Sequence, residues 1–209
     1  MSALSKATLA AMLKKASAII AEEHENLCKL DAATGDGDHG IAMLRTMEGV
    51  SVAVEETAGR TMGDMLKGIA TKVMMCGAGS TSPLLGSYFL GLASAATSDE
   101  LTPEQAAAMF KAGLDRFQKT SKAALGDKTM LDALRPATEV LIETLTANGD
   151  VAGAFSAAAE AAAEGAEKTK GYAAKLGRAR TMGERAVGHY DPGAVSIAHI
   201  FRGFAAASC

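Results

Sequence analysis

Aromatic residues are scarce in this chain of 209 residues. Tryptophan is absent, and aromatic residues make up only 4% of the sequence, although apolar residues make up 48%. The core must therefore be built mainly from Ala, Leu, Met, Val and Ile. Because Ala, Leu and Met favour helices, whereas strands favour aromatic side chains, the composition predicts packed helices rather than a β-sandwich. The length is sufficient for one domain with a substantial core.

The chain also lacks an excess of charge of one sign. Its net charge is −3, with both signs spread along the sequence, so it has no basic stripe of the kind that nucleic acid or anionic lipid requires. No apolar stretch reaches the roughly 20 uncharged residues of a membrane span. Lys14 and Lys15 interrupt the first apolar run, which favours an amphipathic helix over a signal peptide. We expect no nucleic-acid partner and no membrane partner.

Cysteines are few: Cys28, Cys76 and Cys209 are the three in the sequence. They form no CxxC pair, and their odd number and wide spacing do not indicate a disulfide framework. This pattern favours a reducing compartment, and we expect the protein to be cytoplasmic.

No window of the sequence alternates with period two, so we expect no β-sheet. Helical periodicity instead predicts eight helices, at residues 4–29, 40–58, 62–76, 83–97, 103–121, 129–147, 151–170 and 193–207. Thr102-Pro103 reads as a helix start with Gln105 completing a capping box, and Asp150 can cap the helix after Asn148-Gly149. Residues 1–209 are therefore predicted to form a single all-α domain, an antiparallel bundle or closed ring of helices.

The chemically informative residues fall in the loops where helices begin, at 31–40, 77–82, 121–130, 177–183 and 188–193. Loops at one end of a rigid bundle can converge on a shared site. Helix N-termini that point at such a site favour an anion.

The first of these loops is in the stretch LDAATGDGDHGIAM and carries Asp31, Asp36 and Asp38. Three carboxylates within eight residues repel one another unless a cation or solvent separates them. An all-carboxylate set suits Mg²⁺ or Ca²⁺ rather than zinc, and Met47 at the twelfth position excludes an EF-hand. The alternative is a solvated acidic turn in which Asp38 only caps the next helix. His39-Gly40 beside it favours a close ligand.

The second loop is in GAGSTSPLLG, residues 77–86. Its small residues expose backbone N–H groups, and Ser80, Thr81 and Ser82 add hydroxyl groups, which is suitable chemistry for phosphate oxygens. It is neither a Walker A loop nor GxGxxG. An ordinary tight turn between helices is the alternative.

Two further stretches complete the set. GDKTMLDALRP, residues 126–136, reads as a core helix capped by Asp127 or Thr129. GRARTMGERAVGHYDPG, residues 177–193, carries arginines that can clamp phosphates, and Asp191 then caps the last helix. A solvated basic loop pairing with Glu184 is the alternative. Together the four stretches indicate a site for a Mg²⁺-bound nucleotide. His24 and His199 are predicted to be structural or surface residues.

In this order and at these separations, GDGDHG, STSPLLG, GDKTMLDALRP and GRARTMGERAVGHYDPGA closely resemble the nucleotide-binding L subunit of dihydroxyacetone kinase (the DhaL family), over essentially the whole chain. The resemblance implies a closed barrel of eight antiparallel helices with the nucleotide in loops at one rim. It also implies that Asp31, Asp36 and Asp38 hold two Mg²⁺ ions against the phosphates of ADP or ATP. The residues that match the family's nucleotide contacts are His39, Gly40, Ile41, Ala42, Ser80, Thr81, Ser121, Met130, Arg178, Asp191, Pro192 and Gly193.

The chain departs from the family pattern at three places in this set. Ala42 stands where the family often has Asn, Ser121 where it has Gly, and Thr81-Ser82-Pro83 where it has Ser-Gly-Pro. Contacts made by the Asn side chain are therefore missing here, while backbone contacts can persist.

The resemblance implies a phosphotransferase that moves a phosphoryl group to dihydroxyacetone, or to a related ketose such as erythrulose. The sugar is held covalently on a histidine of a separate K subunit, so no catalytic residue is assigned to this chain. We favour ADP as a tightly bound cofactor that a phosphohistidine protein of the phosphotransferase system rephosphorylates. One alternative is a kinase subunit that uses freely exchanging ATP. The other is a non-catalytic nucleotide sensor that controls a partner such as a transcriptional regulator. The sugar and the oligomeric state, including a homodimer, stay open.

Overall fold

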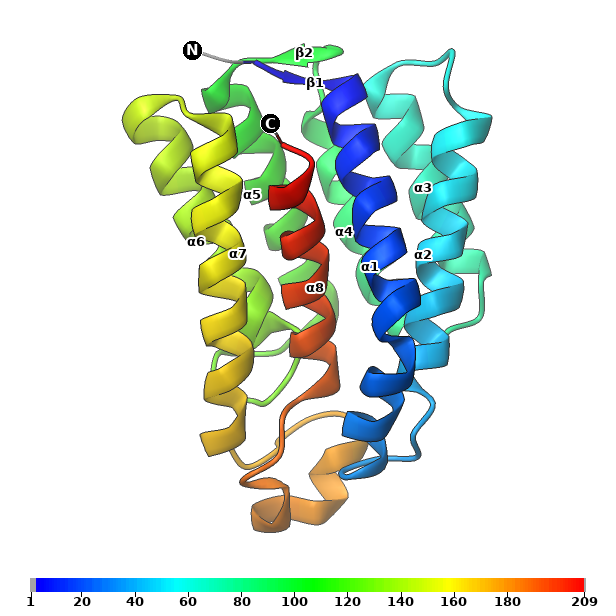
Figure 1. The fold of residues 1–209 in the computed structure, drawn as a ribbon, viewed down its shortest axis with the longest axis vertical. Helices are drawn as coiled ribbons and strands as arrows, with labels where there is room; N and C mark the ends of the chain where they lie inside the picture. Colours follow the sequence, from blue (N-terminus) through cyan, green and yellow to red (C-terminus); the bar gives the residue numbers. More distant parts are fainter. Residues whose placement is uncertain (1–2, 209) are drawn as a thin grey trace.

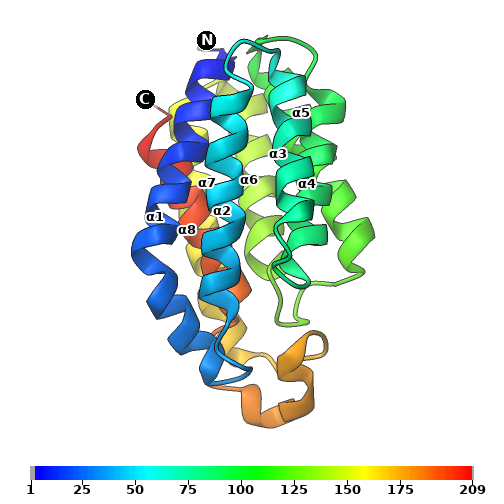
Figure 2. The ribbon, with the colours of Figure 1, turned by 90° about the vertical axis from the view of Figure 1, so that its right-hand side faces the viewer.

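The computed structural model describes residues 3–208 of the chain. Eight α-helices make up most of this part: α1 (Lys6–Ala32), α2 (His39–Glu56), α3 (Met62–Met75), α4 (Thr81–Ala95), α5 (Pro103–Ser121), α6 (Leu131–Asn148), α7 (Val151–Lys168) and α8 (Pro192–Ala206). Each helix packs against its neighbours in sequence, and α8 returns to pack against α1 (Figures 1 and 2). The predicted all-α fold, a closed ring of antiparallel helices, is confirmed.

Several helix ends follow from their local sequence. Thr102 accepts the backbone N–H of Gln105, whose side chain accepts the N–H of Thr102 in return, so the predicted capping box at the start of α5 is confirmed. Asp150 accepts the N–H of Gly153 at 3.1 Å and caps α7 as predicted. Caps of this kind fix where each helix begins because they satisfy donors that have no partner within the helix.

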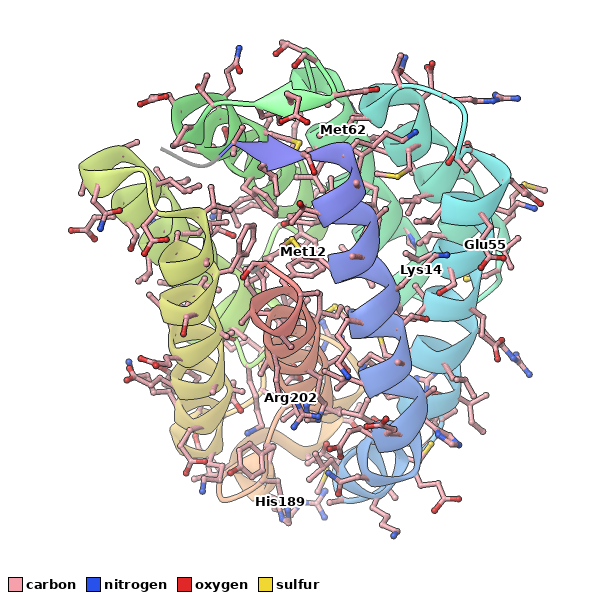
Figure 3. All side chains as sticks on the ribbon, turned by 45° about the horizontal axis from the view of Figure 1, so that its top comes forward. Met12, Lys14, Glu55, Met62, His189 and Arg202 are labelled. Atoms are coloured by element: carbon pink, nitrogen blue, oxygen red, sulfur yellow. The ribbon has the colours of Figure 1, made fainter. Side chains whose placement is uncertain are left out.

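The interior of the ring is filled by methionine, leucine, alanine and a few aromatic rings. Met12, Met43, Phe110 and Phe155 are completely buried, and the rings of Phe110 and Phe155 meet edge to face with their centroids 5.4 Å apart. On the outer surface, Lys14 of α1 and Glu55 of α2 lie side by side, with Nζ and Oε1 3.3 Å apart (Figure 3). Exposed pairs contribute little to stability, so packing of the interior holds the ring together.

One expectation about secondary structure is wrong. Two short strands, β1 (Leu4–Ser5) and β2 (Glu100–Leu101), pair antiparallel, although we expected no sheet. Two residues are too few to produce an alternating sequence pattern, and the pairing is set instead by Leu4 and Leu101, which face each other and are fully buried. Ser5 then caps α1, which begins at Lys6 rather than at residue 4.

The alternating direction of the helices decides where the loops lie. The N-termini of α2, α4, α6 and α8 point toward one end of the ring, and β1 and β2 cover the other end (Figure 1). The loops that carry the sequence motifs therefore gather at the same end. Two 3₁₀ segments, η1 (Thr169–Gly171) and η2 (Arg178–Ala186), lie there too, and η2 occupies a stretch that we predicted to be a loop. No helix in residues 3–208 has the length and apolar character to cross a membrane.

Candidate functional site

A cavity of about 560 Å³ opens at the loop end of the ring, a size typical of small-molecule sites. Its walls come from the N-terminus of α2, the loop between α3 and α4, the segment that joins α5 to α6, the residues before η2 and the N-terminus of α8. The predicted site residues that line it are Asp31, Asp38, His39, Ile41, Ala42, Ser80, Thr81, Ser121, Met130, Arg178, Asp191, Pro192 and Gly193.

The three aspartates form one cluster at the edge of this cavity. Asp31 lies near the end of α1 and is buried, whereas Asp36 and Asp38 lie in the exposed loop that follows. One carboxylate oxygen from each lies within 4.8 Å of the other two. Oδ2 of Asp31 also accepts the backbone N–H of His39 at 3.1 Å, which fixes the start of α2 beside the cluster.

The guanidinium of Arg178 bridges two of these carboxylates. Its Nη1 lies 2.7 Å from Oδ1 of Asp38 and also contacts Asp36. Arg178 therefore supplies part of the positive charge that the cluster needs, and it pairs with these aspartates rather than with Glu184. Three converging carboxylates that already attract a cation fit the oxygen ligands that Mg²⁺ prefers.

His39 connects the start of α2 to α8. Its Nε2 lies 2.8 Å from Oγ of Ser196. The Ser196 hydroxyl donates its proton to the carbonyl of Pro192. The Ser196 oxygen therefore accepts a hydrogen bond from the imidazole N–H. Burial lowers the pKa of His39, although the charge of Asp31 opposes that shift. The imidazole is therefore held neutral, and its visible role is to position two helix N-termini.

Asp191 is the N-cap of α8, as predicted. Its Oδ2 accepts the N–H of Ala194 at 2.7 Å. Removal from solvent raises the pKa of Asp191 to about 7; the bond from Ala194 and the charge of Lys128 act in the opposite direction, while Asp132 adds to the rise. Pro192 occupies the first helical position beside the cavity.

The loop between α3 and α4 presents small groups to the cavity. Gly77 and Gly79 have positive φ angles of 67° and 56°, which glycine adopts without strain. The hydroxyl of Ser82 accepts the N–H of Ala78 at 2.9 Å, so it stabilises the loop itself. Ser80 is exposed at the start of α4, where its hydroxyl and the helix N-terminus can meet an anion.

Two predicted residues are placed elsewhere. Gly40 is buried between α2 and α1, where a Cβ would lie 1.8 Å from the carbonyl oxygen of His24, and it is not among the residues that line the cavity. Asp36 lies in a neighbouring shallow hollow, which it shares with Thr34 and Arg178.

The predicted cap of α6 is only partly right. Thr129 accepts the N–H of Leu131 at 3.2 Å, but Asp127 accepts the N–H of Ala124 and pairs with Lys175 instead. The helix begins at Leu131, two residues later than predicted, because Asp132 holds the preceding turn with its own carboxylate.

Sequence reasoning missed several residues of the cavity wall. Lys128 is buried there, Arg45 lies one turn beyond Ile41 on α2, and Phe117 adds an apolar surface from α5. Burial lowers the pKa of Lys128, and the charges of Asp191 and Asp132 oppose that shift. Lys128 lies within GDKTMLDALRP, among the turn residues before α6. That position was the sequence feature that could have indicated Lys128 as a residue of the cavity wall.

Comparison with known proteins agrees with this architecture. Residues 33–206 match the DAK2 domain. The ADP-binding subunit DhaL of the PEP-dependent dihydroxyacetone kinase of Escherichia coli K12 is 35% identical over 195 residues, which cover 93% of each chain. The corresponding subunit of the first such kinase of Listeria innocua is 35% identical over 182 residues, covering 87% of this chain and 86% of that protein.

Longer proteins contain a similar region. D-erythrulose kinase of Mycolicibacterium smegmatis is 37% identical over 185 residues, covering 86% of this chain but 31% of that protein. The crystal structure of the dihydroxyacetone kinase of C. freundii in its native form aligns with a TM-score of 0.74 at 23% identity, and the complex with AMP-PNP and Mg²⁺ with 0.72 at 22%. Each alignment covers 99% of this chain and 35% of the larger one, so the two proteins share this fold.

Proposed function

The chain belongs to the DAK2 domain family, and we propose that it is the nucleotide-binding subunit of a dihydroxyacetone-type kinase. It transfers a phosphoryl group from a Mg²⁺-bound nucleotide to dihydroxyacetone, or a related small ketose, held covalently on a histidine of a separate K subunit. The observation that carries this proposal is the cluster of Asp31, Asp36 and Asp38 with Arg178 at the edge of a cavity rimmed by helix N-termini. The names of full-length relatives, which are ADP-binding subunits, support it.

Asp31, Asp36 and Asp38 are the proposed ligands of two Mg²⁺ ions. When bound, these ions neutralise and polarise the phosphate oxygens of the nucleotide. Arg178 already lies beside the cluster. Its guanidinium is therefore in place to compensate the negative charge of the phosphoryl group during the transfer. The N-termini of α4 and α8 add backbone N–H groups that favour phosphate oxygens.

The predicted nucleotide contacts that line the cavity stay part of the proposal, from His39, Ile41 and Ala42 on α2 to Pro192 and Gly193 on α8. In the transfer, the bond between phosphorus and the nucleotide oxygen breaks as the bond to a sugar hydroxyl oxygen forms. We assign no general base to this chain. In this proposal the hydroxyl proton is therefore transferred to a group outside it. Positioning and charge compensation are the contributions of this subunit.

We favour a phosphohistidine protein of the phosphotransferase system as the phosphoryl source, with ADP staying bound as a cofactor. Relatives that match this chain over nearly their whole length are named PEP-dependent in E. coli and PTS-dependent in Lactococcus lactis.

The proposal requires two partners, the K subunit and this donor, and does not require a homodimer. Because ADP and phosphohistidine donors are cytoplasmic, we infer that the protein acts there. The relatives are named as kinases, which favours an enzyme over the nucleotide sensor.

The metal assignment is tested by replacing two of the exposed carboxylates with amides of the same shape. The protein is mixed with a K subunit, dihydroxyacetone and the phosphoryl donor, and the sugar phosphate formed is measured. Asp36→Asn combined with Asp38→Asn should lower the rate by about 100-fold or more, since amides cannot neutralise the metal charge. Asp115→Asn, exposed on α5 and paired with Lys111, is the control. A fully active double variant would mean that the metal ligands lie elsewhere.

A further inference from the structure

Lys128 is a cation enclosed in the wall of the cavity. Only 2% of the residue is exposed, and its Nζ donates to two backbone carbonyl oxygens, those of Thr169 and His189, each at 2.5 Å. No ion pair within residues 3–208 involves it, although Asp132 and Asp191 lie near enough to influence its charge. Burying an ammonium costs free energy, and here its hydrogen bonds go to two backbone carbonyl oxygens while Asp132 and Asp191 act on it at a distance.

The turn that carries Lys128 is built to aim it inward. Asp132 is buried, and its two carboxylate oxygens accept the N–H groups of Gly126 at 2.6 Å and Thr129 at 2.7 Å. This closed turn places Lys128 in the left-handed region, with φ of 61°, which is uncommon for a residue with a side chain. In this conformation the ammonium reaches Thr169, which follows α7, and His189, which lies in the loop before α8.

The two acceptors belong to segments that are also joined by other contacts, among them a hydrogen bond from the Tyr190 hydroxyl to Glu167. Thr169 ends α7, and its hydroxyl accepts the N–H of Asp191 at 2.9 Å. The N–H of Gly188 donates to the carbonyl of Lys170 at 2.7 Å. Lys128 adds a buried ammonium to these bonds, and it contacts both segments at the point where the chain turns into α8.

The residues that follow these contacts lie on the nucleotide side. Asp191 caps α8, and Pro192 and Gly193 line the cavity. Gly193 is close to Met130, since a Cβ on Gly193 would lie 2.7 Å from Cγ of Met130. A small displacement of the segment 188–191 would therefore move the start of α8 and change the shape of the cavity.

We propose that Lys128 is a positioning residue of the nucleotide site: through Thr169 and His189 it holds the segment 188–191 and thereby sets the start of α8 against the bound nucleotide. This inference rests on the proposed function, because it takes a Mg²⁺-bound nucleotide as the occupant of the cavity. It assigns Lys128 no contact with the reacting atoms.

The test uses Lys128→Gly, because glycine adopts a φ of 61° without strain and the turn closed by Asp132 can persist. The affinity for Mg·ADP is measured by calorimetry on the full chain, after bound nucleotide has been removed, and the unfolding midpoint is measured without nucleotide. Leaving the buried carbonyl of Thr169 and the carbonyl of His189 without their donor should weaken Mg·ADP binding by about tenfold or more. Adding n-propylammonium, which can enter the vacated space and donate to the same carbonyls, should restore much of the affinity. Propanol should not.

Lys168→Met is the control, since Lys168 is a nearby lysine on α7 that is exposed and paired with Glu164. If the wild type and this control bind Mg·ADP but Lys128→Gly binds equally well, the positioning role is wrong while the proposed function stands. Weak binding that the amine does not restore would also overturn the role, because the side chain would then act through packing. If the wild type itself does not bind Mg·ADP, the proposed function fails. Should Lys128→Gly not fold, Lys128→Gln, whose amide NH₂ can still donate, is measured in the same way and should show an intermediate loss, whereas an unchanged affinity would overturn the role.

Discussion

Asp191 shows how one residue serves both the fold and the site. It caps α8 through the N–H of Ala194, its own N–H is bound by Thr169, and its carboxylate faces the cavity near Asp132 and Lys128. Removal from solvent raises its pKa to about 7, so the group changes charge near neutral pH. A carboxyl whose folded pKa exceeds its unfolded value favours folding more in its protonated form.

The stability of the nucleotide-free protein should therefore depend on Asp191 between about pH 4 and 7, the range that its unfolded and folded pKa values span. The contribution of this carboxyl to the free energy of unfolding is largest at the acid end and is lost as the pH rises through its folded pKa. Asp191→Asn keeps an oxygen for Ala194 but does not ionise. We expect the variant to match the wild type near about pH 4 and to be more stable at about pH 8 by about 1–2 kcal/mol, measured by urea unfolding in EDTA. Parallel pH profiles for the two proteins would contradict the assignment, and Asp115→Asn serves as the control.

The sequence motifs named many of the residues that line the cavity, but not the direction in which each side chain points. The stretch LDAATGDGDHG predicted the cluster of Asp31, Asp36 and Asp38. The same stretch could not reveal that Gly40 faces α1 rather than the cavity. Lys128 was missed because its burial depends on carbonyls of Thr169 and His189, which lie far along the chain from it.

At the scale of elements, the site depends on how closely α1 and α2 approach. Gly40 lies in the first turn of α2, where a Cβ would lie 1.8 Å from the carbonyl oxygen of His24 and 2.8 Å from the sulfur of Cys28. A close approach of this kind holds the N-terminus of α2, with Asp38 and His39, beside the end of α1. Glycine is required because no larger residue fits between the helices.

Gly40→Ala should separate a packing role from a nucleotide contact. The added Cβ would lie 1.8 Å from the His24 oxygen, so α2 must move, and overpacking of this kind lowers the free energy of unfolding by about 1–3 kcal/mol. Urea unfolding of the nucleotide-free protein measures this loss. Gly59→Ala is the control, because nothing lies within 4 Å of a Cβ at Gly59. An unchanged stability together with weaker Mg·ADP binding would show that Gly40 contacts the nucleotide instead.

Helix positions were largely predictable because periodicity and caps are local features. The starts of α5, α7 and α8 follow from Thr102, Asp150 and Asp191. The start of α6 was misplaced by two residues because Asp132, inside the helix, organises the turn before it. The pair β1 and β2 escaped prediction because its partners are far apart in sequence and only two residues long.

At the scale of the whole molecule, a closed ring of antiparallel helices brings four helix N-termini to one end (Figure 2). Composition and periodicity predicted the helices, and the resemblance to the DhaL family predicted their closure. The ring provides a rigid wall on which loops from five parts of the sequence form one cavity. Helix N-termini favour anions such as phosphates and clustered carboxylates favour a divalent cation, which is why we propose a nucleotide site at this end of the ring.

The most direct test of the account is to identify what the purified protein carries. The full chain is purified in Mg²⁺ buffer and dialysed at length, and the nucleotide and metal released on denaturation are identified and quantified. We predict near-stoichiometric ADP together with Mg²⁺, as expected for a relay that a phosphohistidine protein recharges. An empty protein that binds Mg·ATP reversibly would contradict the tightly bound cofactor and indicate an ordinary ATP-dependent subunit. A protein that neither carries nor binds a nucleotide would contradict the central claim.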